Sequence, residues 1–126
     1  MKILIAEDDP LTREGLRDIL LAEGYEVETA PDGQTALECY RTEKPHMLCL
    51  DIMMPHLSGY DVCREIRKND SQTPIIFISA KSEEIDKVLG LEIGADDFIE
   101  KPFGVKEVVA RIRAVTRRAI AKKTKP

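Results

Sequence analysis

The sequence lacks several features that would place it in a specialised class of proteins. It contains no tryptophan, and no apolar run approaches the roughly 18 residues that a membrane-spanning helix requires. The N-terminal segment reaches acidic residues by position 7, too early for the apolar core of a secretory signal. We therefore expect a protein of the cytoplasm that does not insert into a membrane.

Cysteine is also scarce, and its spacing argues against cysteine-based sites. The three cysteines, Cys39, Cys49 and Cys63, are odd in number and far apart, so we expect neither a disulfide framework nor a metal-binding pair. A glycine-rich phosphate loop is missing as well. Small thiols packed inside a protein of a reducing compartment are the simplest interpretation.

Charge is unevenly distributed along the 126 residues, whose number suits a single domain. Residues 111–126 carry seven of the 19 basic residues and no acid, so residues 1–110 have a net charge of −11. A basic end can contact nucleic acid, or it can be a solvated helix face that leads into a linker. The absence of aromatic residues there favours the second interpretation. We expect one domain at 1–121 and the start of a basic linker at 122–126.

Short apolar runs alternate with amphipathic segments along the chain. This pattern predicts strands at 2–6, 25–30, 47–50, 74–79 and 97–100, and helices at 12–23, 34–43, 59–68, 82–94 and 105–122. Three of the strands contain continuous apolar runs, as is typical of parallel strands that are covered on both faces. Five such units predict an α/β fold with a doubly wound parallel sheet.

Polar residues follow four of these strands, at the point where each strand ends. Glu7 and Asp8 come after the first strand, and Asp51 follows the third. Ser79 ends the fourth, and Lys101 follows the fifth. Because the carboxyl ends of parallel strands share one edge of a sheet, we expect these side chains to converge there.

This combination of residue types suits the transfer of a phosphoryl group to a carboxylate. Neighbouring carboxylates repel one another unless a cation lies among them, and Mg²⁺ prefers carboxylate and phosphate oxygens. A carboxylate can attack phosphorus to form an acyl phosphate, whose oxygens then need positive or donor partners. Lysine, serine and a metal ion would supply these partners.

Each residue alone has a simpler interpretation. The acids before Pro10 can cap a helix, Asp51 can belong to a turn, Ser79 can cap a helix, and Lys101 can be an ordinary surface lysine. Two other activities also remain open. A flavin-binding electron carrier would need a loop rich in serine, threonine and glycine after the first strand. An aspartyl-phosphate phosphatase would need an aspartate at position 7 followed by one at position 9.

The chain resembles bacterial response-regulator receiver domains along its whole length. The resemblance is carried by the segments ILIAEDD, LDIMMPHLSGYD, ISA and EKPF, which contain the residues named above. It implies a flavodoxin-like five-stranded sheet of order 2-1-3-4-5. It also implies a switch controlled by phosphorylation rather than a metabolic enzyme.

The resemblance assigns a role to each residue of this set. Asp51 would accept the phosphoryl group, and Ser79 and Lys101 would bind its oxygens. Glu7, Asp8, Asp51 and the backbone carbonyl of Met53 would hold Mg²⁺. Ser79 and Phe98 would act together as the switch, and the Lys101–Pro102 peptide bond would be cis.

Finer features resemble the OmpR/PhoB subfamily of transcription factors, namely GLEIGADDFIEKPF followed by KEVVARIRAVTRRA. A sensor histidine kinase would be the phosphodonor, and phosphorylation would favour a homodimer. DNA would be bound only through a C-terminal domain that this chain does not include. The dimerisation face would contain three charge pairs and an apolar patch: Lys87 with Glu107, Asp97 with Arg111, Asp96 with Arg118, and Val88, Leu91 and Val109.

Overall fold

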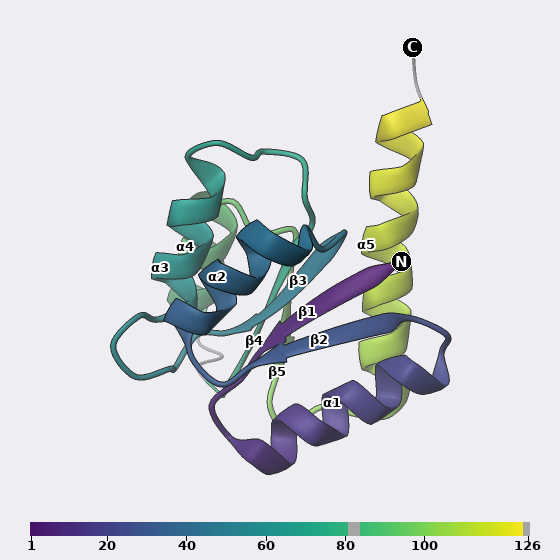
Figure 1. The fold of residues 1–126 in the computed structure, drawn as a ribbon, viewed down its shortest axis with the longest axis horizontal. Coiled ribbons are helices and arrows are strands. Elements are labelled where there is room, and N and C mark those ends of the chain that lie inside the picture. Colours follow the sequence, from purple (N-terminus) through teal and green to yellow (C-terminus); the bar gives the residue numbers. More distant parts are fainter. Residues whose placement is uncertain (81–83, 125–126) are drawn as a thin grey trace.

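The core of the protein is a parallel five-stranded sheet, seen in a computed structural model that describes residues 1–80 and 84–124 (Figure 1). The strand order is β2-β1-β3-β4-β5, and every neighbouring pair is parallel. This confirms the predicted flavodoxin-like order. The strands are β1 (Lys2–Ala6), β2 (Glu26–Ala30), β3 (Met47–Asp51), β4 (Ile75–Ser79) and β5 (Asp97–Glu100).

Five helices cover the sheet on both faces. Figure 1 shows α2, α3 and α4 grouped on one side and α1 and α5 on the other. The two buried clusters agree with this division, since one joins the sheet to α2 and α3 and the other joins it to α1 and α5. The helices are α1 (Pro10–Ala22), α2 (Gly33–Glu43), α3 (Gly59–Arg67), α4 (Glu84–Ile93) and α5 (Val105–Thr124).

The inner positions of the central strands are apolar because both faces of these strands are buried. Along β3, Leu48 and Leu50 face the cluster under α2 and α3, whereas Met47 and Cys49 face the cluster under α1 and α5. Successive side chains of a strand point to opposite faces, so a strand between two helical layers needs apolar residues at every position. The continuous apolar runs of the sequence therefore mark the buried strands.

Helix starts differ from the sequence prediction where a cap was overlooked. Helix α1 begins at Pro10 rather than at residue 12, because the Asp9 side chain caps it and proline suits the first helical position. Asp32 caps α2 in the same way, so that helix begins at Gly33. The predicted opening of α4 at 82–84 lies partly outside the described residues. Helix α5 continues to Thr124, two residues beyond the predicted end.

Helix α4 is attached to the sheet by little buried side-chain surface. Gly90 is the buried residue of its described part, and a Cβ atom there would lie 2.9 Å from the Phe77 ring. Ile85, Val88 and Leu91 are exposed. Most apolar side chains of α4 therefore face outward, although Ile93 at its end packs against the core, and its glycine lets the helix backbone rest on an aromatic ring.

Within the described part of the chain, none of the helices combines the length and the apolar character needed to cross a membrane.

Candidate phosphoryl-acceptor site

The predicted polar residues lie at the carboxyl ends of four strands. Asp51 is the last residue of β3 rather than the first residue of the following loop. Ser79 is the last residue of β4, and its carbonyl accepts a hydrogen bond from the Lys101 backbone at 2.9 Å. The Lys101 ammonium lies 2.5 Å from Glu7 Oε1 and 3.3 Å from Asp51 Oδ2. The structure thus brings Glu7, Asp51 and Lys101 into direct contact.

The three consecutive acids after β1 have different roles. Asp9 caps α1, since its carboxylate accepts hydrogen bonds from the Thr12 backbone at 2.9 Å and the Thr12 hydroxyl at 2.6 Å. Those bonds hold the pKa of Asp9 below its ordinary value. Glu7 is buried and Asp8 is exposed, and each has a carboxylate oxygen within 4.8 Å of a carboxylate oxygen of Asp51. The capping interpretation therefore applies to Asp9, and the other two acids belong to the site.

The buried carboxylates are electrostatically unfavourable neighbours. Burial, and then the adjacent Asp51 carboxylate, raise the pKa of Glu7 against the opposing effect of Lys101. Burial favours a neutral amine at Lys101, but the bond to Glu7 and the charge of Asp51 raise the pKa of Lys101 above its ordinary value. The lysine therefore carries a positive charge between two acids that would otherwise repel each other.

The acidic cluster has the composition of a site for a hard dication. Glu7, Asp8 and Asp51 each offer an oxygen atom, and these atoms lie within 4.8 Å of one another. Mg²⁺ favours such carboxylate oxygens and keeps positions for water and phosphate. The three acids therefore fit Mg²⁺. Met53 lies beside them, and its backbone N–H donates to Asp51 Oδ1 at 3.1 Å.

Glycine at position 59 allows α3 to begin directly against the end of β3. A Cβ atom on Gly59 would lie 2.4 Å from the carbonyl oxygen of Asp51. The Gly59 backbone N–H donates to the Ile52 carbonyl at 2.9 Å, which holds the segment after Asp51 in a tight loop. The first turn of α3 therefore packs directly against the backbone of Asp51.

The two residues that the resemblance assigns to switching lie on neighbouring strands. Ser79 is fully buried at the end of β4, and Phe98 on β5 is 9% exposed. Phe98 packs in the cluster that also contains Phe77, next to α4. The Lys101–Pro102 peptide bond that follows β5 is cis.

Five of the six charged residues of the predicted dimerisation face, all but Arg118, form ion pairs within the described part of the chain. Lys87 forms an ion pair with Glu100, whereas Arg111 bonds Asp97 at 3.1 Å and Glu107 at 3.3 Å. Asp96 pairs with Arg67 at 3.3 Å. Of the apolar members of that face, Val88 and Leu91 are exposed and Val109 is half-buried.

Sequence reasoning missed two arginines that organise loops. Arg13 on α1 donates to the main-chain carbonyl of Glu7 at 2.9 Å, which ties the acidic loop to the helix. Arg67, at the end of α3, bonds groups that are 27 and 29 residues further along the chain. Arg13 follows Asp9 by four residues, a helical spacing that is visible in the sequence, but nothing local to Arg67 indicates its partners.

Comparisons with known proteins agree with this geometry. Residues 3–113 match the response regulator receiver domain family. The chain is 51% identical over 117 residues to a probable transcriptional regulator ycf27 of Galdieria sulphuraria, covering 93% of this chain and 46% of the relative. It is 47% identical over 118 residues to the alkaline phosphatase synthesis transcriptional regulatory protein PhoP of Bacillus subtilis, covering 94% and 49%. The chain thus spans about half the length of the curated relatives it matches.

A solved structure supports the same assignment. The BeF3-activated N-terminal receiver domain of Klebsiella pneumoniae RstA superposes with a TM-score of 0.88 at 33% identity, over 93% of this chain and 99% of that one. These likenesses decide against a flavin carrier and against an aspartyl-phosphate phosphatase. The chain belongs to the response regulator receiver domain family, and it is a signalling domain rather than a conventional enzyme.

Proposed function

We propose that Asp51 accepts a phosphoryl group from the phosphohistidine of a sensor histidine kinase in the cytoplasm. The observation that carries this proposal is the position of the Lys101 ammonium. It lies between Glu7 and Asp51, which form a cluster of three carboxylates together with Asp8. A structural salt bridge would need one acid. A cluster with an excess of carboxylates suits a site that also receives a dication and an anionic group.

In the proposed transfer, a carboxylate oxygen of Asp51 attacks the phosphorus atom. The phosphorus–nitrogen bond of the phosphohistidine breaks, its electron pair returns to the imidazole, and an acyl phosphate forms on Asp51. The Lys101 ammonium and the Ser79 hydroxyl bind phosphoryl oxygens. Glu7, Asp8, Asp51 and the Met53 carbonyl would hold Mg²⁺, which would offset the negative charge of the reacting groups.

The kinase needs a docking surface close to Asp51, and an apolar cavity beside Lys101 is suitable. This cavity of about 550 Å³ lies between α1 and the segment after β5, and Leu11 at its edge is 81% exposed. Exposed apolar surface next to a reacting group fits a transient protein partner better than a small metabolite. Its lining residues include Leu11, Gly15, Ile19, Pro102 and Phe103.

Asp51→Asn tests the acceptor directly. The variant is expected to take up no phosphoryl group from a small phosphodonor such as phosphoramidate with Mg²⁺, because an amide oxygen is a poor nucleophile and forms no stable acyl phosphate. Intact-mass spectrometry would follow the reaction, with Asp61→Asn as a control that changes an aspartate ten positions away on α3. A phosphorylated Asp51→Asn protein would refute the assignment.

Phosphorylation of Asp51 would change the surface formed by α4, β5 and α5, and the switch residues would transmit that change. In this proposal Ser79 moves toward a phosphoryl oxygen, and Phe98 follows into the space beside it. The altered surface of α4, β5 and α5 then forms a symmetric homodimer. The charge pairs would be Lys87 with Glu107, Asp97 with Arg111 and Asp96 with Arg118, each joining two copies. The bonds that these groups make within the chain would have to rearrange or be shared.

We further propose that the domain controls transcription through a DNA-binding domain in a longer protein. This rests on the names of the relatives, which are transcriptional regulators of about twice this length. DNA would not be bound by residues 1–121, and residues 122–126 would lead into the linker. The reading frame that encodes the chain decides whether a further domain follows.

Arg111→Glu tests the dimerisation face. With Mg²⁺ and beryllofluoride as the phosphoryl mimic, wild-type protein is expected to sediment as a dimer and Arg111→Glu as a monomer. Arg117→Glu introduces the same change of charge on an exposed position of α5 outside the proposed pairs, and it should leave the dimer intact. A dimer of Arg111→Glu as stable as that of wild type would exclude this face.

A further inference from the structure

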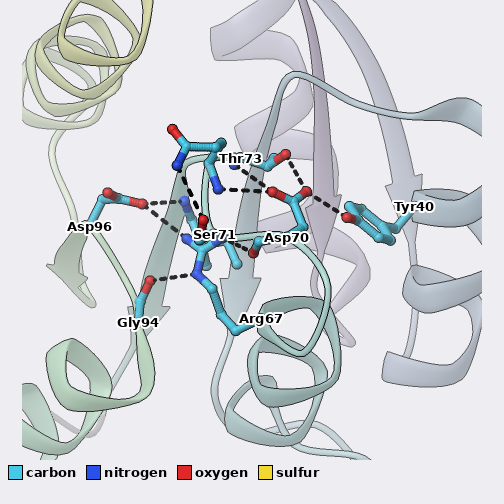
Figure 2. A network of polar contacts seen from close by, with 9 residues as sticks. Tyr40, Arg67, Asp70, Ser71, Thr73, Gly94 and Asp96 are labelled. Atoms are coloured by element: carbon cyan, nitrogen blue, oxygen red, sulfur yellow. Dashed lines mark hydrogen bonds and ion pairs between the residues drawn. The ribbon is translucent and has the colours of Figure 1, made fainter. Parts of the chain in front are cut away.

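Arg67 connects three segments at the amino ends of β4 and β5 (Figure 2). Its Nε donates to the Gly94 carbonyl at 3.0 Å, and its Nη1 donates to the Asp70 carbonyl at 3.0 Å. Its Nη2 lies 3.3 Å from Asp96 Oδ2. The guanidinium thus joins the end of α3 to the loop before β4 and to the turn between α4 and β5.

The turn at Gly94 is shaped to receive this side chain. Gly94 has a φ of +123°, a conformation that residues with a side chain rarely adopt. A Cβ atom there would lie 3.0 Å from Arg67 Nε. The guanidinium therefore packs against the backbone of the turn while it bonds the turn's carbonyl. Since the planar group presents its donors in a fixed fork, it sets the position of the turn and of Asp96 just beyond it.

The Asp96 carboxylate is held through one of its two oxygens. Oδ2 accepts from Arg67 Nη2 and also from the Ile75 backbone N–H at 2.8 Å. No hydrogen bond or ion pair of the described residues is made by Oδ1. The side chain is 37% exposed, so the group is partly accessible although one oxygen is fixed. Asp96 is therefore presented in a defined orientation.

Arg118 lines the same small cavity beside α5 as Asp96 but is not its ion-pair partner among the described residues. Among the described residues the ion pair of Asp96 is with Arg67, and Arg118 Nε donates to the Ala114 carbonyl at 3.4 Å. The guanidinium of Arg118 thus has no acidic partner among them, which leaves it suited to an acid on another molecule.

We propose that Arg67 is a positioning residue for the dimerisation face, holding Asp96 with one oxygen turned outward to bind Arg118 of a second copy. The inference rests on the dimer proposed above, and it adds Arg67, a residue that is not part of the proposed dimerisation face. Arg67 is itself at the end of α3, away from the exposed patch of α4. It acts on the dimer through Asp96, and it leaves the phosphoryl site unchanged.

The test compares dimer dissociation constants of wild type and Arg67→Gln in Mg²⁺ and beryllofluoride by sedimentation. Arg67→Gln is expected to weaken the dimer about fivefold, the equivalent of one partly exposed charge interaction. Phosphorylation of Asp51 by phosphoramidate should be unaffected. Arg64→Gln removes the same charge one turn earlier on α3, where Arg64 pairs with Asp61, and should leave the dimer at wild-type strength.

A double-mutant cycle separates positioning from a general loss of stability. If Arg67 acts through Asp96, Arg67→Gln should weaken the dimer in the wild-type background and have no further effect on the dimer in an Asp96→Ala background. A purely structural role would weaken both backgrounds alike and would overturn the proposal. Arg67→Lys, which keeps the charge but not the fork, should bind as weakly as Arg67→Gln.

Two negative results are distinguishable. If wild type stays monomeric with the mimic, the proposed dimer is wrong and the role of Arg67 falls with it. If wild type dimerises and Arg67→Gln dimerises equally or more tightly, the dimer stands and the positioning role is wrong. A tighter dimer of Arg67→Gln would mean that Arg67 competes with the second copy for Asp96.

Discussion

The ammonium group of Lys101 lies between two buried carboxylates, 2.5 Å from Glu7 and 3.3 Å from Asp51. A single residue thereby neutralises part of an acidic cluster and occupies the place where an incoming phosphoryl group would need a cation. Burial makes this arrangement effective, because charges interact more strongly away from water. The same contacts raise the pKa of Lys101, so the side chain stays charged throughout the physiological range.

Replacing Lys101 should therefore impair phosphorylation more than folding. Lys101→Met is expected to slow phosphoryl transfer from phosphoramidate by about 100-fold, because one donor to the developing charge is lost. Intact-mass spectrometry over time gives the rate. Lys106→Met removes an exposed lysine at the start of α5 and should react at the wild-type rate. A Lys101→Met variant with the wild-type rate would show that Lys101 does not contact the phosphoryl group.

Asp70 is a second residue whose carboxylate accepts several hydrogen bonds. It accepts from the Tyr40 hydroxyl and the Thr73 hydroxyl, each at 2.6 Å, and from the backbone of Gln72 and Thr73 (Figure 2). Burial alone would raise its pKa, but the hydrogen bonds from Thr73 and Tyr40 outweigh burial and hold the pKa of Asp70 well below its ordinary range. Burial and the bond to Asp70 raise the pKa of Tyr40 to about 12, so its hydroxyl remains a donor.

This lowered pKa predicts a pH-dependent contribution to stability. A carboxyl whose pKa is depressed by folding stabilises the protein above its unfolded pKa of about 3.9, and the contribution is lost as the pH falls toward the folded value. Asp70→Asn is expected to lower the free energy of unfolding by about 1–3 kcal/mol at pH 7. The difference from wild type should shrink below about pH 4. Urea unfolding over this pH range measures it, and a difference independent of pH would contradict the assignment.

At the scale of elements, the contact between α3 and β3 depends on the absence of a side chain. Gly59 begins α3 where a Cβ atom would lie 2.4 Å from the Asp51 carbonyl oxygen. Gly15 on α1 differs, since a Cβ atom there would meet nothing within 4 Å. The two glycines therefore provide a matched pair, one required by a close approach and one in an open position.

The same substitution at these two positions should have opposite effects. Gly59→Ala is expected to lower the free energy of unfolding by about 1–3 kcal/mol, because either the helix or the acceptor strand must shift. Gly15→Ala should raise it by up to about 1 kcal/mol, because alanine favours a helix interior. Urea denaturation of both variants checks the pair. Equal changes in the free energy of unfolding at the two sites would show that the contact between α3 and β3 tolerates a side chain at position 59.

At the scale of the whole molecule, the proposed dimer is set by charges on one face of an acidic domain. Residues 1–110 have a net charge of −11, so two copies repel each other unless local pairs of opposite sign compensate. Lys87 and Arg111 already have acidic partners within their own chain. Exposed pairs contribute little affinity each, so they would fix the orientation of two copies more than the strength of binding.

The balance between local attraction and overall repulsion can be measured with salt. If the exposed pairs dominate, raising NaCl from about 0.05 M to about 0.5 M should weaken the beryllofluoride dimer several-fold, because added salt shortens the distance over which exposed charges attract, which is about 10 Å at 0.1 M. Sedimentation at a series of salt concentrations gives the dissociation constant. A dimer that tightens with salt would show that apolar contacts of Val88, Leu91 and Val109 hold it and that repulsion opposes it.

The amino-acid sequence by itself determined which segments form buried strands and the edge at which the polar residues gather, whereas the strand order was implied by the family resemblance. Continuous apolar runs are required wherever a strand is buried on both faces, and parallel strands connected by helices place their carboxyl ends together. Asp51, Ser79 and Lys101 could therefore be assigned to one edge from their positions alone. The capped start of α1 at Pro10 was also encoded locally, in Asp9, although the prediction placed that start at residue 12.

Only the tertiary structure decided which charges meet. Three adjacent acids look alike in the sequence, yet Asp9 turns to α1 while Glu7 turns to Lys101, which is 94 residues away. Arg67 meets Gly94 and Asp96 because α3 ends beside the turn before β5, and no local pattern records that contact. The physical reason is that apolar periodicity reports burial, which is a property of one segment. An ion pair depends on the relative placement of two segments, and packing alone sets that placement.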